Sequence, residues 1–282
     1  MKYAIEVKGV SKDYGDFKLD NISFSIPEGY ICGFIGQNGA GKTTTIKLIL
    51  EIIKRDGGEI RVFGEEVEGK PLLKEDIGVV YDEMGFHDFL TPKDINTIMK
   101  NVYANWQEET FYLYLKRFSL PAKKACGKFS RGMRMKLQIA VALSHSAKLL
   151  IMDEPTSGLD PIVRNEILQI FQEYIMEENH TILLSSHITS DLERIADMLV
   201  FINGGKIILS GNKDELLEKH GLMKCKKTDL ELNEQEDVVS TRQSAFGIEV
   251  LVKDRVSCTK KYADKVIEEA TLEEIMVFYS MK

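Results

Sequence analysis

Hydrophobic residues recur at every second position near the start of the chain and then gather into short uninterrupted runs. The alternation in segments 3–7 and 22–26 predicts two half-buried strands. Segment 30–35 is continuously hydrophobic and has the length of a buried strand. A glycine-rich turn follows it, and helical spacing extends from about residue 42 to residue 53. Strand, glycine loop and helix in this order predict the start of a parallel α/β unit.

The alternation of strands and helices returns in the second half of the chain. Hydrophobic runs at 149–152, 181–185 and 198–202 predict buried strands, and helical spacing over 163–175 separates the first two. Between residues 85 and 146 the pattern instead predicts helices. The sequence therefore indicates an α/β fold with a mixed or parallel sheet core and a helical insertion.

Several short patterns set the expected ends of helices and loops. Thr91 is expected to cap a helix, with Pro92 at its first position and Asp94 three residues after the cap. Further on, Asn212 is expected to cap a short helix that Gly221 can end.

The last part of the chain has fewer residues that mark the ends of helices and strands. Segment 233–244 is polar enough to be a loop, and segment 248–252 is typical of a strand. An amphipathic helix is expected over 271–279.

The composition is that of a folded globular protein, because 44% of the 282 residues are hydrophobic and 29% are charged. The net charge of −7 argues against a broad basic face, so no nucleic-acid partner is expected. No run reaches the ~18 apolar residues that span a bilayer. The cysteines lack C-x-x-C spacing, which favours reduced thiols in a cytosol. They are Cys32, Cys126, Cys225 and Cys258.

A phosphate-binding loop of the form G-x-x-x-x-G-K-[ST] follows the predicted strand 30–35 and precedes the predicted helix. Lys42 is expected to neutralise the β- and γ-phosphates of a nucleotide, and Thr43 to offer its hydroxyl to Mg²⁺. A chance glycine-rich turn is the alternative, and the strand-helix context disfavours it. The residues expected to bind the nucleotide are Gly36, Gln37, Asn38, Gly39, Ala40, Gly41, Lys42, Thr43 and Thr44.

Two adjacent carboxylates follow the buried strand 149–152. Asp153 is expected to bind the metal or its water shell, and Glu154 to face the γ-phosphate. Alone, such a pair is usually only a strand end. Behind a phosphate loop it indicates a hydrolytic centre.

At this point the sequence resembles the nucleotide-binding subunit of an ATP-binding cassette (ABC) transporter of the bacterial export type. The resemblance covers residues 1–220 and leaves residues 221–282 as a C-terminal accessory or regulatory extension. It implies a P-loop cassette with an antiparallel β subdomain and a helical subdomain at about 85–146. The residues that carry it, besides the phosphate loop, are Tyr14, Ser130, Arg131, Gly132, Met133, Asp153, Glu154, Ser157, Gly158, Leu159, Asp160 and His187.

The resemblance implies that ATP is held between two cassettes. Tyr14 would stack on adenine, although a lone tyrosine in a turn is most often a surface residue. Ser130 and Gly132 precede a helix and would complete the ATP site of the opposite subunit, although the sequence alone favours an ordinary serine N-cap at Ser130. Asp160 would pass between the subunits. The expected assembly is a homodimer or a heterodimer with a related cassette.

The resemblance also assigns the catalytic pair. Glu154 would be the general base that polarises water, and His187 would contact the γ-phosphate. A single histidine is usually structural, but His187 directly follows a predicted strand.

Two motifs depart from the family pattern, at three positions. Asp82 stands where the family usually has a glutamine that touches Mg²⁺ and the membrane partner. We expect Asp82 still to bind the metal, because carboxylates ligate hard cations. Arg131 and Met133 replace the usual Gly and Gln of the signature, a variant that also occurs in export ATPases of the family.

The resemblance implies an ATPase that binds ATP and Mg²⁺ and powers an exporter of drugs, peptides, lipids or antibiotics. Its transmembrane permease subunits would be separate chains, and the protein would be cytoplasmic and peripheral on the inner face of the membrane. One alternative is a soluble ABC-type ATPase that acts on ribosomes or DNA. Another is a phosphoryl transferase outside the family, which the signature and His187 disfavour.

Overall fold

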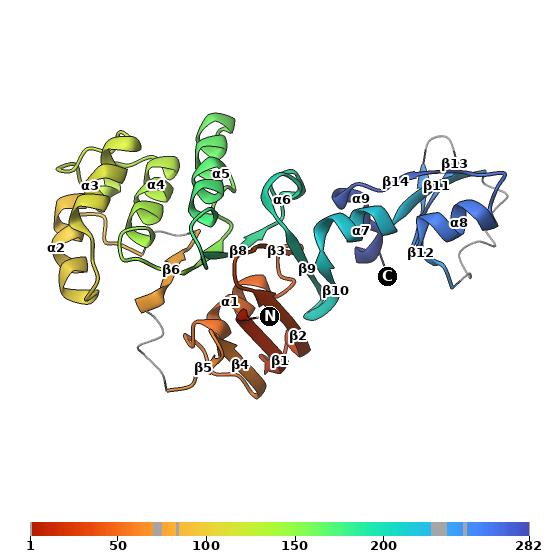
Figure 1. The fold of residues 1–282 in the computed structure, drawn as a ribbon, viewed down its shortest axis with the longest axis horizontal. Helices are drawn as coiled ribbons and strands as arrows, with labels where there is room; N and C mark the ends of the chain where they lie inside the picture. Colours follow the sequence, from red (N-terminus) through yellow and green to blue (C-terminus); the bar gives the residue numbers. More distant parts are fainter. Residues whose placement is uncertain (1, 70–74, 83–84, 227–235, 245–246, 282) are drawn as a thin grey trace.

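The computed structural model describes residues 2–69, 75–82, 85–226, 236–244 and 247–281. Figure 1 shows an elongated arrangement in which helices α2 (Pro92–Val102) and α3 (Glu108–Arg117) lie at one end. An α/β body occupies the middle. Strands of the last sixty residues form a small separate sheet at the other end.

The central sheet has the order β10-β9-β3-β8-β7-β6 in the described chain. All its neighbouring strands pair in parallel except β10, which pairs antiparallel with β9. Every residue of β3 and β7 is buried, as expected for parallel strands covered on both faces. The strands are β3 (Ile31–Ile35), β6 (Ile77–Val80), β7 (Leu149–Asp153), β8 (Thr181–Ser186), β9 (Met198–Asn203) and β10 (Lys206–Asn212).

An antiparallel sheet near the N-terminus has the order β2-β1-β4-β5. Its hydrophobic face shares one core with helix α1 and one side of the central sheet, so α1 lies between the two sheets. The helix expected to reach residue 53 ends at Ile49, because Glu51 adopts a left-handed conformation with φ 54°. The elements are β1 (Tyr3–Asp13), β2 (Lys18–Pro27), β4 (Gly57–Val62), β5 (Glu65–Glu66) and α1 (Lys42–Ile49).

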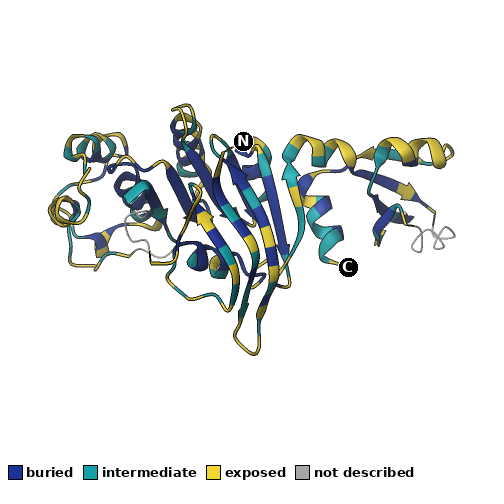
Figure 2. Ribbon diagram, turned by 60° about the horizontal axis from the view of Figure 1, so that its bottom comes forward, coloured by how far each residue is buried: buried dark blue, intermediate teal, exposed yellow. Residues whose placement is uncertain are grey.

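Helices cover the opposite face of the central sheet. The insertion contains α2, α3, a short 3₁₀ turn η2 (Cys126–Lys128) and α4 (Arg131–Ala142), and α4 packs on β6. Thr91 and Asp94 form the reciprocal cap expected from the sequence, which is confirmed. Helices α5 (Pro161–Ile175) and α6 (Thr189–Ile195) join the same core. Figure 2 shows buried residues gathered in the strands at the middle of the molecule, whereas exposed residues lie on the helices and at intervals along strands such as β1 and β2.

The C-terminal sheet is antiparallel, with the order β12-β13-β11-β14. The expectation of a polar loop over 233–244 is wrong for residues 238–244, which form β12; residues 233–235 lie outside the described residues. Val238 and Val239 are buried and anchor this strand despite its polar neighbours. The elements are α7 (Lys213–Lys219), β11 (Gly221–Cys225), β12 (Val238–Ser244), β13 (Gly247–Val252), α8 (Arg255–Lys261), β14 (Val266–Glu269) and α9 (Leu272–Ser280).

Helix α9 joins the C-terminal sheet to the main body. Ile275 and Phe278 pack on that sheet, whereas Leu272 belongs to the core beneath α6. The Leu272 N–H also donates to Glu193 Oε1 on α6 at 2.9 Å. In the described part of the chain, no helix is long and apolar enough to cross a membrane.

Candidate nucleotide-binding and hydrolysis site

The phosphate loop connects β3 to α1 through residues that need glycine. Gly39 and Gly41 have φ values of 82° and 114°, which side chains rarely adopt. A Cβ on Gly36 would lie 2.6 Å from the carbonyl oxygen of Ile202, so this close approach also requires glycine. Helix α1 has no side-chain cap at Gly41. Its first N–H groups are therefore available to an anion.

Lys42 is 5% exposed and lies over this loop. Its Nζ donates to the carbonyl oxygens of Gly36 at 2.6 Å and Gln37 at 3.4 Å. It also lies 3.1 Å from Glu154 Oε1. A buried ammonium group is stable only when paired, so these contacts hold Lys42 at the mouth of the loop.

Asp153 ends β7 beside the phosphate loop. The Thr43 hydroxyl donates to Asp153 Oδ2 at 2.7 Å, and the Ser185 hydroxyl donates to Oδ1 at 2.5 Å. The structure thus brings together Thr43 and Asp153, two of the three residues expected to bind metal. Ser185 was not expected at the site, and its position at the end of the neighbouring strand β8 is the signal for it.

Glu154 adopts a left-handed backbone conformation with φ 52°. Its N–H donates to the hydroxyl and carbonyl oxygens of Ser185 at 3.1 and 3.2 Å. Its Oε2 lies 2.7 Å from His187 Nδ1. Oε1 is buried and has no hydrogen bond from any described residue, although Lys42 stands beside it. A strained backbone at a buried, ion-paired carboxylate is typical of a functional residue.

A cavity of about 370 Å³ opens above the loop. Phe17 forms part of its wall, whereas Tyr14 is 52% exposed, does not line the cavity and lies beneath the Lys12 ammonium group at 5.6 Å. Sequence reasoning missed Phe17, although it stands only three residues beyond Tyr14. The lining residues are Phe17, Gln37, Asn38, Gly39, Gly41, Lys42, Thr43, Thr44 and Glu154.

The signature residues lie apart from this cavity. Ser130 caps α4, with its hydroxyl accepting the Met133 N–H at 3.2 Å. Asp160 caps α5 by accepting the Ile162 and Val163 N–H groups at 3.1 Å. Ser130 and Asp160 are exposed, and none of Ser130, Gly132 and Asp160 lines the cavity.

The segment after β6, residues 81–82, contains Asp82, the third residue expected to bind metal. The Asp82 carboxylate accepts a hydrogen bond from Arg131 Nη2 at 2.5 Å and does not line the cavity. Its neighbour Tyr81 has a buried hydroxyl without a hydrogen-bond partner among the described residues. Burial, together with the charge of Asp153, raises the pKa of Tyr81 to about 12. The pairing of Val80 with Met152 explains why Tyr81 comes close to Asp153.

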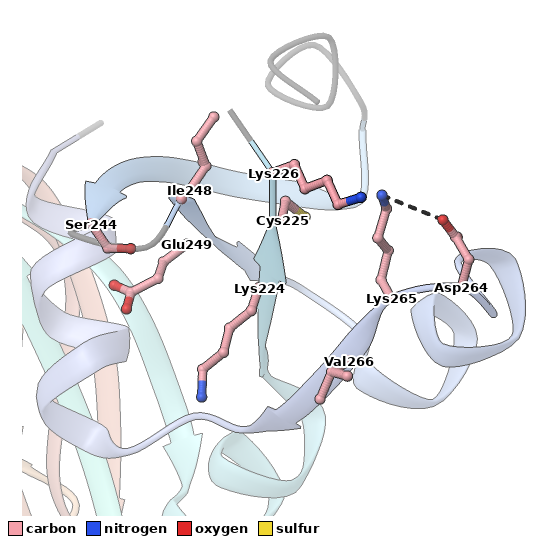
Figure 3. Close-up of a pocket in the computed structure, with 10 residues that line it drawn as sticks. Lys224, Cys225, Lys226, Ser244, Ile248, Glu249, Asp264, Lys265 and Val266 are labelled. Carbon is pink, nitrogen blue, oxygen red and sulfur yellow. Dashed lines mark ion pairs between the residues drawn. The ribbon is translucent and has the colours of Figure 1, made fainter. Parts of the chain in front are cut away.

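A second cavity, of about 580 Å³, lies in the C-terminal sheet (Figure 3). Lys224 pairs with Glu268 at 2.6 Å, and Lys265 pairs with Asp264 at 3.3 Å. Two of the lysines that line this cavity are thus already paired with acidic side chains. Among the described residues, no group of three or more His, Cys, Asp or Glu side chains is arranged to hold a metal ion.

The sequence profile described as ABC transporter matches residues 19–157. The bacitracin transport ATP-binding protein BcrA of Bacillus licheniformis is 35% identical over 252 residues, which cover 88% of this chain and 81% of that protein. The lantibiotic transport ATP-binding protein SrtF of Streptococcus pyogenes is 36% identical over 213 residues, which cover 74% of this chain and 91% of that protein.

Solved structures agree at the level of the fold. A structure described as the ATP-binding subunit of an ABC transporter matches with a TM-score of 0.69 and 27% identity, covering 76% of this chain and 91% of that one. A dimeric ATP-binding cassette bound to ADP and Pi matches with a TM-score of 0.66 and 21% identity, covering 74% of this chain and 98% of that one.

The phosphate loop, the paired acids and the cassette fold define a P-loop ATPase. The chain belongs to the ABC transporter family, as one of its ATP-binding, ATP-hydrolysing subunits.

Proposed function

We propose that this protein powers the export of a peptide antibiotic by hydrolysing ATP at the Lys42–Glu154–His187 cluster. Its membrane-spanning permease would be formed by separate chains, and the protein would lie against the cytoplasmic face of the membrane. The observation that carries the export function is the similarity to proteins named for bacitracin and lantibiotic transport, which extends over most of each relative. The geometry of the cluster supports the chemistry.

Nucleotide binding would begin at the phosphate loop. The free N–H groups at the start of α1 would donate to phosphate oxygens, and the positive end of the helix would attract them. Lys42 would exchange its contact with a loop carbonyl for a phosphate oxygen. Because Lys42 is already buried and held, little side-chain order would be lost in that exchange.

Thr43 and Asp153 would hold Mg²⁺. Their hydroxyl and carboxylate oxygens are hard donors, already 2.7 Å apart, and suit this cation. When bound, Mg²⁺ neutralises charge that develops on the phosphates. Ser185 would keep Asp153 oriented through its hydrogen bond to the other carboxylate oxygen.

Glu154 would accept a proton from the attacking water. Its Oε1 is ion-paired with Lys42, whereas Oε2 is held by His187. The oxygen paired with Lys42 thus faces the phosphate loop, and the oxygen held by His187 fixes the carboxylate plane. A base positioned in this way needs no rearrangement when water attacks.

Ser130, Gly132 and Asp160 would act in a dimer of two cassettes. Ser130 and Asp160 are exposed, and all three residues lie away from the cavity of their own chain. The N-terminus of α4 would therefore complete the partner's ATP site. Each of two facing copies would supply these three residues to the ATP site of the other.

The test is affinity purification of Glu154→Gln from detergent-solubilised membranes in the presence of ATP. This variant is expected to retain ATP and the closed dimer, and so to keep a membrane-spanning protein bound. Glu177→Gln, at an exposed glutamate, is the matched control and should hydrolyse ATP normally. Recovery of Glu154→Gln as a soluble monomer without any membrane protein would overturn the proposal.

A further inference from the structure

Two of the three positions at which the sequence departs from the family pattern, Asp82 and Arg131, contact each other. Arg131 Nη2 lies 2.5 Å from Asp82 Oδ1, although 49 residues separate them. Arg131 is the first residue of α4, directly after the signature serine. Asp82 stands two residues beyond β6, next to the strand that ends in Asp153. Neither departure is therefore an isolated change.

Helix α4 holds the same segment at a second point. The Gln138 side chain accepts the Tyr81 N–H at 3.4 Å and donates to the Tyr81 carbonyl oxygen at 3.1 Å. Gln138 is buried and lies two turns further along α4 than Arg131. The segment after β6 is thus fixed to α4 through both its backbone and its side-chain charge.

Arg131 also fills the space beside Gly158. A Cβ on Gly158 would lie 2.8 Å from Arg131 Nη1, and the backbone there has φ +65°. Gly158 stands two residues before Asp160, which caps α5. One guanidinium group on the signature helix therefore pairs with the segment after β6 and lies beside the turn before α5.

We propose that Arg131 is a positioning residue that holds the Asp82 carboxylate on α4 and neutralises it. The segment after β6 and the signature helix then move as one unit, and the charge of Asp82 stays paired on α4. The proposal rests on the proposed function only where it concerns ATP hydrolysis. The linkage itself is a property of the nucleotide-free protein.

The Arg131–Asp82 ion pair is exposed and therefore weak. Both side chains are 49% exposed, and pairs of this kind contribute up to about 1 kcal/mol to stability, which is about five-fold in an equilibrium constant. The pair is therefore too weak to hold the fold together. It is strong enough to bias a local opening between two segments.

The test is a double-mutant cycle of Arg131→Met, Asp82→Asn and the double variant, read by hydrogen exchange without nucleotide. Each single variant should speed amide exchange in β6 and the first turns of α4 by about two- to five-fold, and the double variant no further. Arg131→Lys should restore most of the protection. Arg134→Met, which removes an arginine one turn along that pairs with Asp88 at 3.4 Å, should leave β6 unchanged.

Steady-state ATPase measurements complete the test. The single variants are expected to lower kcat by about two- to five-fold with KM little changed, again without additivity. Unchanged exchange in both single variants, or additive effects in the double variant, would overturn the linkage. A protein that hydrolyses no ATP would defeat the proposed function, while the exchange cycle would still decide the linkage.

Discussion

Glu154 and His187 are joined by a 2.7 Å contact between Oε2 and Nδ1, and the His187 N–H also points to the same oxygen at 3.4 Å. The carboxylate is therefore held from one side by two groups of a single residue. Lys42 stands on its other side, 3.1 Å from Oε1. This order, from lysine to carboxylate to histidine, links the phosphate loop to the end of β8.

Glu154→Gln should abolish most ATP hydrolysis and leave ATP binding intact. The amide keeps the shape of the side chain but cannot accept a proton from water, so kcat is expected to fall by about 10²- to 10⁴-fold. His187→Ala should cost less, because Glu154 would remain. Single-turnover hydrolysis and equilibrium nucleotide binding separate the two effects. A Glu154→Gln variant with near-normal kcat would exclude Glu154 as the base.

Lys42→Met should weaken ATP binding itself. A charge-assisted hydrogen bond of about 1.5–3 kcal/mol would be lost, which corresponds to about a 10- to 150-fold higher Kd. Lys47→Met, in the last turn of α1, is the control, because Lys47 does not line the cavity. Titration with a fluorescent ATP analogue measures both. Equal Kd values for the two variants would contradict the role of Lys42.

Phe17 is expected to contribute more to nucleotide affinity than Tyr14. Phe17 lines the cavity and Tyr14 does not, and stacking of a base on an aromatic ring contributes about 1–3 kcal/mol. Phe17→Ala should therefore raise the Kd for ATP by about five-fold or more, whereas Tyr14→Ala should change it little. The opposite ranking would restore the stacking role that the sequence analysis assigned to Tyr14.

Stability should fall on acidification because of two buried histidines. Burial lowers the pKa of both His145 and His220 below the ordinary 6.5. The unfolded chain then binds more protons than the folded one, so their contribution is complete above about pH 6.5 and is lost as the pH falls toward the folded pKa values.

Thermal unfolding at about pH 7.5 and about pH 5.5 measures this dependence. Tm should be lower at the acidic pH, and the His145→Gln, His220→Gln double variant should lose less Tm between the two conditions. In the neutral ring of His220, Nδ1 carries the proton, because it lies 2.7 Å from the Leu216 carbonyl oxygen. An identical pH dependence in the wild type and the double variant would contradict the assignment.

The sequence predicted the parts of the fold that local patterns encode. The buried runs around β3, β7 and β8, the Thr91–Asp94 cap and the phosphate loop all depend on neighbouring residues. Strand β12 was missed because its two buried valines stand in a polar stretch, and only β13 beside it makes that stretch a strand.

The sequence predicted only those site residues that belong to a recognisable motif. Lys42, Asp153 and Glu154 follow from spacing and strand ends. The Arg131–Asp82 ion pair could not be foreseen, because it depends on how the helical insertion folds back over 49 residues. Phe17 and Tyr81 likewise depend on how neighbouring elements pack and carry no motif.

Peptide transport into inverted membrane vesicles tests the proposed export function most directly. Vesicles containing this chain and its co-purified permease would be supplied with ATP and either bacitracin or a lantibiotic, because inversion turns export into uptake. Wild-type vesicles are predicted to accumulate one of these peptides only with ATP, and vesicles with Glu154→Gln should accumulate none. Equal accumulation in the two kinds of vesicle, or none in either, would contradict export powered by this site.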